Sequence, residues 1–249
     1  MDKSPYPIIK IPQPWITTEQ MIEVDRLMIE EYGIILLQMM ENAGSNLARF
    51  VTHFMTNPSE EILVFAGNGH NGGGGLTAAR HLFNHGYNVK IILTGNPAKM
   101  RKVTHHQFDI VKNMAIPVEI TIPLKNEIEE TGLIIDAMIG YGLTDDINYK
   151  YINIVKVVNE VNNIQVVSLD APTGLNTTTG LSTQHAIKAT QTLTLAYPKI
   201  GLATPNAKGY IGELFVADIS VPPKIYQKLG IEPRRLFNAS PIIKINSES

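Results

Sequence analysis

The sequence predicts an α/β protein with a mostly parallel sheet, helices on both faces of that sheet, and a helical segment before it. Short apolar runs alternate with longer amphipathic stretches from about residue 60 onward. Most of these runs lack the regular polar alternation of half-exposed strands, which is typical of parallel strands buried on both faces. The 249 residues are 44% hydrophobic and 18% charged, which is enough chain to bury a sizeable core.

The N-terminal segment combines an arm with two helices. Residues 1–16 contain four prolines and are predicted to form an extended arm. Thr17 and Gln20 have the spacing of a capping box, so a helix should follow and end near Gly33. Apolar residues at helical spacing predict a second helix over residues 36–53. We predict that residues 17–249 form a single domain.

The rest of the chain supplies the strands and the helices that connect them. Strands are predicted at residues 62–66, 89–93, 118–122, 133–137, 166–169 and 192–195, with an added edge strand within residues 211–219. Helices are predicted near residues 75–85, 99–114 and 150–162. The tail after Pro222 shows little periodicity, and no element is predicted there.

Composition excludes several classes of function. The formal net charge of -2 argues against a partner among nucleic acids, whose binders usually carry a strong basic excess. The absence of cysteine rules out disulfides, thiol catalysis and thiolate metal sites. No apolar stretch is long enough to span a membrane, and the first residues do not resemble a signal peptide. We therefore expect a soluble cytoplasmic protein that does not bind membranes.

Ligands of open α/β sheets bind outside the carboxyl ends of the strands, so the residues just after each strand matter most. After the first strand, glycine occupies six of the nine positions in residues 67–75. Such a loop can adopt positive φ and approach a ligand closely, and the following helix would direct free N–H groups at a phosphate or pyrophosphate. A flexible turn is the alternative, since the match of Gly67, Gly69 and Gly72 to a dinucleotide fingerprint is weak on its own.

Two carboxylates follow two later strands. Asp136 ends the apolar run at residues 133–137, and Asp170 follows the run at residues 166–169 with Thr173 three residues on. Buried carboxylates are costly unless they are paired, ligated or placed in a cleft. The two could therefore share a cation or divide acid and base roles. The alternatives are a turn cap for Asp136 and an ordinary turn after Asp170.

These segments, taken in order, resemble one known family. The sequence is similar to the NAD(P)H-hydrate epimerases, the YjeF N-terminal domain family, over roughly residues 17–225. Single motifs are weak, but the ordered set is specific. The motifs that carry the resemblance are Met40-Glu41-Asn42-Ala43-Gly44, the glycines and Asn71 of residues 67–75, Ala78-Ala79-Arg80-His81-Leu82, Asp136-Ala137 with Gly140 and Gly142, Asp170 with Pro172, Gly174 and Leu175, and Pro198-Lys199 with Gly201 and Leu202.

The resemblance implies a Rossmann-like three-layer α/β/α sandwich and a repair reaction. Hydrated NADH and NADPH exist as R and S forms at C6 of the nicotinamide ring, and the epimerase interconverts them. A dehydratase that acts on the S form is the implied partner, and we expect it to be a separate protein. A homodimer is among the oligomeric states left open.

The resemblance also implies the site residues. K+ would be bound by Asn71, Asp136 and Thr173. We expect Asp170 to carry the proton transfer, because a carboxylate tied to a cation is a poor base. The residues expected to meet the substrate are His70, Asn71, Gly72, Gly73, Gly74, Gly140, Tyr141, Gly142, Leu143, Thr144, Asp145, Asp146 and Asp170.

Two positions depart from the family pattern. His70 and Gly74 stand where the family loop commonly has Asn and Asp, and the lost acid leaves open a catalytically weak nucleotide-binding or scaffold module. Thr173 replaces the usual Ser and keeps the hydroxyl. A dehydrogenase is less consistent with the sequence, because Leu93-Thr94-Gly95 places no acidic residue after the second strand to bind a ribose.

Overall fold

A computed structural model describes residues 4–9, 15–55, 57–143 and 146–246. Its strands form one nine-stranded sheet, which is parallel except where β8 meets β9. The order across the sheet is β1-β9-β8-β7-β6-β5-β2-β3-β4. The strands are β1 (Ile8–Ile9), β2 (Glu61–Ala66), β3 (Asn88–Leu93), β4 (Val118–Glu119), β5 (Leu133–Ala137), β6 (Gln165–Leu169), β7 (Gln191–Leu195), β8 (Glu213–Ala217) and β9 (Ile242–Ile245).

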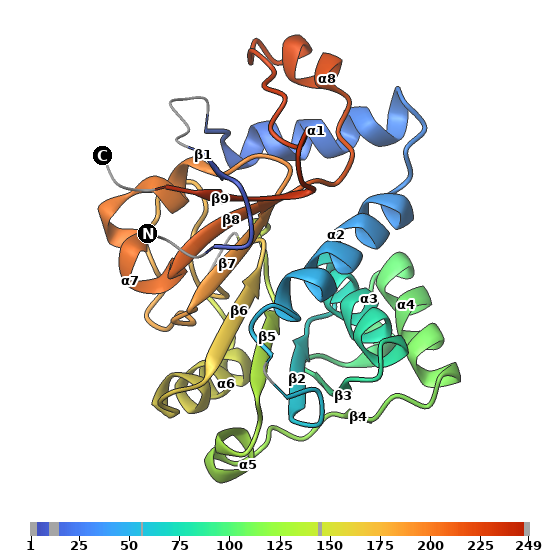
Figure 1. The fold of residues 1–249 in the computed structure, drawn as a ribbon, viewed down its shortest axis with the longest axis vertical. Helices are drawn as coiled ribbons and strands as arrows, with labels where there is room; N and C mark the ends of the chain where they lie inside the picture. The colour runs from blue at the N-terminus through green and yellow to red at the C-terminus, as the bar shows by residue number, and fades with distance from the viewer. Residues whose placement is uncertain (1–3, 10–14, 56, 144–145, 247–249) are drawn as a thin grey trace.

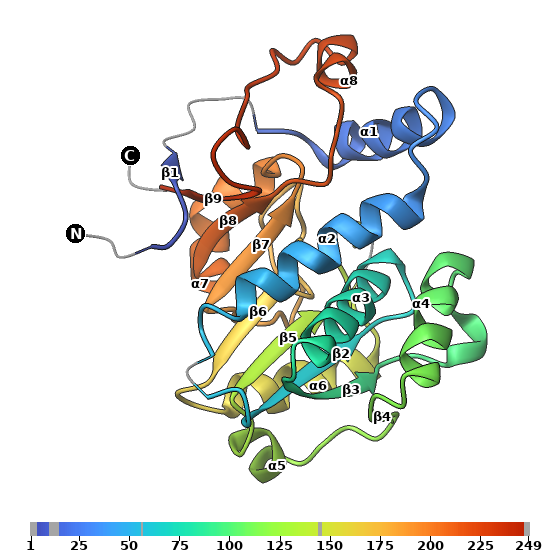
Figure 2. The same cartoon turned by 45° about the vertical axis from the view of Figure 1, so that its right-hand side comes forward.

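Helices cover both faces of this sheet (Figures 1 and 2). Helices α2, α3 and α4 pack on one face, and α5 and α6 pack on the other. The helices are α1 (Thr18–Glu30), α2 (Leu36–Val51), α3 (His70–Asn84), α4 (Lys102–Asn113), α5 (Lys125–Glu129), α6 (Tyr149–Glu160), α7 (Lys208–Ile211) and α8 (Pro223–Lys228), with short 3₁₀ turns at Pro97–Lys99, Ile200–Ala203 and Pro205–Ala207. The predicted fold class is confirmed.

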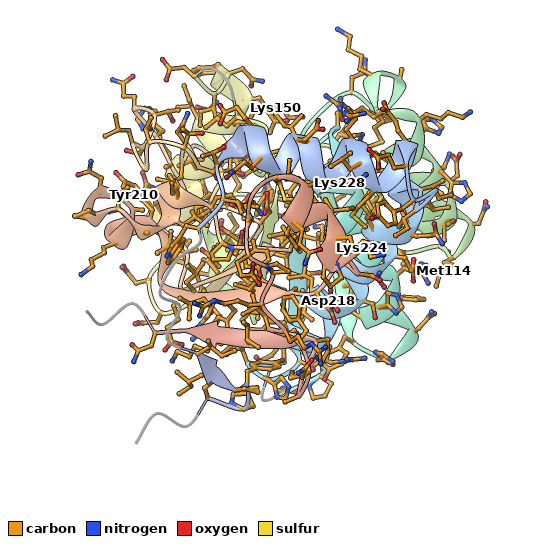
Figure 3. All side chains as sticks on the ribbon, turned by 90° about the horizontal axis from the view of Figure 1, so that it is seen from above. Met114, Lys150, Tyr210, Asp218, Lys224 and Lys228 are labelled. Atoms are coloured by element: carbon orange, nitrogen blue, oxygen red, sulfur yellow. The ribbon has the colours of Figure 1, made fainter. Side chains whose placement is uncertain are left out.

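Helix α1 begins as the sequence predicts. The Thr17 side chain accepts a hydrogen bond from the Gln20 N–H, and the Gln20 side chain accepts one from the Thr17 N–H, which completes the capping box. The helix buries Met21, Val24 and Met28 at helical spacing. Seen from above, α8, which carries Lys224 and Lys228, lies beside α1 (Figure 3). An ion pair between Lys228 and Glu31 joins the two segments.

The N-terminal arm takes part in the sheet. Strand β1 pairs in parallel with β9, and the Lys244 N–H donates to the Pro7 carbonyl over 2.9 Å. Further along, Ile16 forms an isolated parallel bridge with Lys199. The beginning of the chain is therefore held against segments from its C-terminal half.

The observed elements differ from the expected ones in five respects. Strand β8 lies between β7 and β9 and is not at the edge of the sheet. The tail holds α8 and β9, which were not expected because each is short, and α5 was missed for the same reason. Strand β4 is shorter than expected: its pairing with β3 stops at Glu119, and Ile120 beyond it is exposed. The glycine segment is largely helix, since α3 begins at His70.

No helix among the described residues is both long enough and apolar enough to cross a bilayer.

Candidate functional site

The chain reverses its course through the sheet at β2. From β2 it runs outward through β3 to β4, and then it returns to place β5 on the other side of β2. Such a switch point opens a crevice at the carboxyl ends of the two strands, where ligands of open α/β sheets bind. A cavity of about 700 Å³ lies there. Its lining includes residues that follow β2, β5 and β6, together with side chains from α1 and α2.

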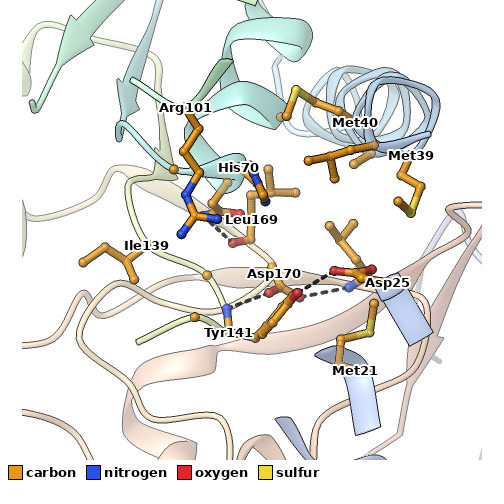
Figure 4. Close-up of a pocket in the computed structure, with 18 of the residues that line it drawn as sticks. Met21, Asp25, Met39, Met40, His70, Arg101, Ile139, Tyr141, Leu169 and Asp170 are labelled. Carbon is orange, nitrogen blue, oxygen red and sulfur yellow. Dashed lines mark hydrogen bonds between the residues drawn. The ribbon is translucent and has the colours of Figure 1, made fainter. Parts of the chain in front are cut away.

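The cavity has a polar wall and an apolar wall (Figure 4). The apolar wall is made by Met21, Ile22 and Ile29 of α1 with Leu36, Met39 and Met40 of α2. The polar wall includes Asn68, His70, Asn71, Arg101, Tyr141 and Asp170, with Asp25 reaching it from α1. A site of this kind can hold a ligand with both a ring system and charged groups.

The glycines of residues 67–75 serve close packing. None of them has positive φ, contrary to the expectation for this segment. A Cβ on Gly72 would lie 1.8 Å from the Gly67 carbonyl oxygen, and a Cβ on Gly73 would lie 2.5 Å from the Met40 side chain. The glycines therefore let α3 begin close to the end of β2 and to α2.

The N-terminus of α3 faces the cavity. Gly69 is its N-cap, and the Gly73 N–H makes the first backbone bond of the helix, to the Gly69 carbonyl. The amides that precede Gly73 have no carbonyl within the helix to bind, and no acidic side chain stands in the first turn. Arg101 points into the same region (Figure 4), and burial together with Arg101 lowers the pKa of His70. This end of the cavity favours an anion.

Asp136 and Thr173 form a buried cluster at the ends of β5 and β6. The Thr173 hydroxyl donates to Asp136 Oδ1 over 2.7 Å, and the Thr173 N–H donates to Oδ2 over 2.8 Å. The Ser168 hydroxyl and the Met138 N–H supply two more donors. Burial raises the pKa of Asp136, and these hydrogen bonds act in the opposite direction.

Among the described residues, Asn71 forms no hydrogen bond with Asp136 or Thr173. Its Nδ2 donates to the Leu169 carbonyl over 3.1 Å. Asn71 Oδ1 and Asp170 Oδ2 both lie close to Gly140. A Cβ added to Gly140 would be 3.1 Å from the Asn71 oxygen and 2.8 Å from the Asp170 oxygen. The structure thus joins Asp136 to Thr173, and it places Asn71 with Gly140 and Asp170.

Asp170 sits at the bottom of the cavity in a buried ion pair. Its φ is +66°, a conformation that is uncommon for a residue with a side chain. Lys199 Nζ lies 2.6 Å from Asp170 Oδ1, and the exposed fractions of the two side chains are 0% and 3%. The Tyr141 N–H donates to Asp170 Oδ2 over 2.8 Å. The carboxylate is therefore fixed in orientation from two sides.

Tyr141 connects Asp170 to helix α1. The Tyr141 hydroxyl donates to Asp25 Oδ2 over 2.5 Å, and its ring lies 5.7 Å from Lys199 Nζ. Burial raises the pKa of Asp25, while the Tyr141 hydrogen bond and the nearby Lys199 lower it. Burial, and then Asp25, raise the pKa of Tyr141.

The structure sorts the predicted substrate residues into three groups. The cavity is lined by His70, Asn71, Gly74, Gly140, Tyr141, Gly142 and Asp170. Gly72 and Gly73 are buried in α3, Leu143 packs against the core on the α6 face, and Asp146 is exposed. Thr144 and Asp145 lie outside the described residues.

Sequence reasoning missed three polar residues of the site. Lys199 lies four residues past β7, so the rule about strand ends would have included it. Asp25 lies at helical spacing from Met21 and Met28, so it shares the buried face of α1. A carboxylate on that face is the signal of a special role. Arg101 gave no signal, because it reaches the cavity only through the packing of α4 beside α3.

The sheet order and the cavity at its switch point define an α/β protein of the Rossmann-like kind, with a candidate ligand site at the carboxyl ends of its strands. The family model described as "YjeF-related protein N-terminus" matches residues 36–201. The chain belongs to this family.

Relatives and one solved structure cover most of the chain. It is 36% identical over 235 residues to the NAD(P)H-hydrate epimerase of Dehalogenimonas lykanthroporepellens, covering 93% of each protein. It is 32% identical over 234 residues to the bifunctional NAD(P)H-hydrate repair enzyme Nnr of Salinibacter ruber, covering 88% of this chain and 43% of that protein. The crystal structure of the yeast protein YNL200c matches with a TM-score of 0.80 and 25% identity, over 93% of this chain and all of that one.

Proposed function

We propose that this protein is an NAD(P)H-hydrate epimerase, which interconverts the R and S forms of hydrated NADH or NADPH at C6 of the nicotinamide ring. Three relatives with that name match the chain over 82–93% of its length at 34–36% identity. The observation that carries the proposal is Asp170, a buried and oriented carboxylate that lines the cavity at the switch point. An acid–base residue is what inversion at C6 requires.

The cavity has separate places for the parts of the substrate. The open amides at the start of α3, with Arg101 beside them, suit the pyrophosphate. The reduced ring would then lie toward Asp170, with the apolar side chains of α1 and α2 along it. The volume of about 700 Å³ lies within the range of small-molecule sites.

Asp170 can start the inversion through reversible ring opening. It takes the proton of the C6 hydroxyl and passes it to N1 while the C6–N1 bond breaks and its electron pair goes to N1. C6 becomes an aldehyde, whose other face is open to attack by N1 when the ring closes. Lys199 keeps Asp170 in place, because its ammonium group donates to Asp170 Oδ1 while Thr194 and the Leu195 carbonyl accept from the same nitrogen.

A potassium site formed by Asn71, Asp136 and Thr173 is part of this proposal. Hard oxygen donors suit such a cation, and a carboxylate with no exposed surface, whose pKa is raised by burial, favours a nearby positive charge. Among the described residues, Asn71 Oδ1 accepts no hydrogen bond, and the Thr173 hydroxyl already contacts Asp136. Bound there, the cation would supply positive charge next to the substrate.

The proposal includes a place for the protein in the cell. A dehydratase that consumes the S form would act next, and the bifunctional repair relatives are consistent with such a linked activity. The chain spans 43–44% of the length of those relatives. We place the reaction in the cytoplasm, as the sequence predicts.

The test is an epimerisation assay on resolved R-hydrate, coupled to a dehydratase that accepts only the S form. The wild type should convert the R form, and Asp170→Asn should be slower by roughly 10²–10⁴-fold. Asp109→Asn, an exposed carboxylate of α4, is the matched control and should leave the rate unchanged. A folded wild-type protein that binds NADPH but converts neither hydrate would refute the proposed function.

A further inference from the structure

Inversion at C6 needs a proton at two places. When the ring opens, the C6 oxygen loses its proton on one face of the ring. When the ring closes from the other face, the oxygen points elsewhere and must receive a proton there. Asp170 is held by Lys199 and by the Tyr141 N–H, so it cannot follow the oxygen across the ring.

Asp25 is the other carboxyl group that lines the cavity, among the described residues. It comes from α1, whereas Asp170 follows β6. Tyr141 spans the space between them, since its N–H binds Asp170 and its hydroxyl binds Asp25. The two carboxyl groups thus contact the two ends of one tyrosine and enter the same cavity from two different elements.

We propose that Asp25 is a second proton-exchanging residue of the site, that the Tyr141 hydroxyl positions it, and that it serves the C6 oxygen of the epimer that Asp170 does not reach. This inference rests on the proposed function. As the ring closes toward the S form, Asp170 takes the N1 proton, the N1 lone pair forms the bond to C6, and the oxygen takes a proton from Asp25. The enzyme then holds its proton on Asp170 in place of Asp25, and exchange with solvent restores the first state.

The surroundings of Asp25 suit this role. Burial raises its pKa, which favours the protonated form that must donate, while Tyr141 and Lys199 lower that pKa and Asp170 raises it. Burial raises the pKa of Tyr226, from α8, and Asp25 is among the charges that raise it further. Only one oxygen of Asp25 binds Tyr141 in the described part of the chain, so the other is available to a ligand.

The first test compares Asp25→Asn with Glu23→Gln. Asn matches the size of Asp but cannot exchange a proton, so kcat should fall about 10²-fold in both directions with KM nearly unchanged. Glu23 lies on the same helix in an exposed ion pair with Arg26, and its variant should keep the wild-type rate. NADPH binding measured by fluorescence confirms that each variant is folded.

The second test uses Tyr141→Phe and the pH dependence of the R-to-S rate. Asp25 must be protonated to donate, so the wild-type rate should fall as pH rises through its pKa. The hydrogen bond from the Tyr141 hydroxyl lowers the pKa of Asp25. Without that hydroxyl, the falling limb of the pH–rate profile should therefore move to higher pH. If Asp25 and Tyr141 had a purely structural role, Tyr141→Phe would reduce the rate without shifting the falling limb of the pH–rate profile.

The outcomes separate the two proposals. If the wild type converts R-hydrate and folded Asp25→Asn is as fast, the second-residue inference is wrong and the proposed function stands. If Tyr141→Phe leaves the limb in place or moves it to lower pH, the inference is also overturned. A wild type that binds NADPH but inverts neither hydrate overturns both.

Discussion

Lys199→Met should destabilise the protein more than loss of a surface charge does. The variant leaves the Asp170 carboxylate without its cation in a place where the two side chains are 0% and 3% exposed. Removing one partner of a buried ion pair typically costs about 3–5 kcal/mol, because the remaining charge is uncompensated. For a chain of this size that corresponds to a fall in Tm of about 6–20 °C. Differential scanning calorimetry on the purified variant measures it.

Two further variants test whether the unpaired buried charge causes the loss of stability in Lys199→Met. Lys228→Met removes a cation from the exposed pair with Glu31, and it should leave Tm nearly unchanged because surface pairs contribute little. The double variant Asp170→Asn/Lys199→Met removes both buried charges and should recover much of the loss. If Lys199→Met melts within about 2 °C of the wild type, or if the double variant is no more stable than the single one, the reasoning about an unpaired buried charge is wrong.

Three other outcomes follow from the site. Gly72→Ala should unfold at clearly lower temperature, because its Cβ meets the Gly67 carbonyl, whereas Gly69→Ala, with open space at that position, should melt like the wild type. Asp136→Asn should lower the free energy of unfolding by about 1–3 kcal/mol in urea titration, because either orientation of the amide turns an NH₂ group toward a backbone N–H. Arg101→Met should weaken NADPH binding about 10–100-fold by fluorescence titration, since a hydrogen bond to a charged group contributes about 1.5–3 kcal/mol; unchanged affinity would remove Arg101 from the phosphate site.

The sequence was sufficient for the elements whose signals are local. The capping box at Thr17 and the apolar strands β2, β3, β5, β6 and β7 were predicted to within a residue or two. Strands β2, β5 and β6 are almost wholly buried, so their apolar runs have sharp ends, while β3 and β7 carry polar residues between buried apolar ones. Ligands of open α/β sheets bind outside the carboxyl ends of the strands, and this rule alone predicted that Gly140 and Asp170 belong to the site. Both residues line the cavity.

The rest depended on contacts between distant segments. Glycines normally predict loops, yet Gly72 and Gly73 lie in α3. These helical positions are glycine because Gly67, just after β2, and the side chain of Met40 leave no space for Cβ atoms. Strand β9 is four residues long and depends on β8 and β1 for its hydrogen bonds. Asp25 reaches the site from α1 and binds the hydroxyl of Tyr141, which lies more than a hundred residues away in the chain.

The pairing of β1 with β9 has a consequence for the order in which the protein forms during synthesis. Residues 8–9 are synthesised more than two hundred residues before their partner strand, because Ile8 pairs with Lys244 and Ile9 with Ile245. The N-terminal arm therefore has no partner strand to dock on while the rest of the sheet is being translated. Its docking closes a loop of more than two hundred residues, and such a non-local contact carries an entropic cost that slows its formation. A nascent chain stalled before residue 242 would therefore leave the arm without its partner strand and would leave β8 paired with β7 alone.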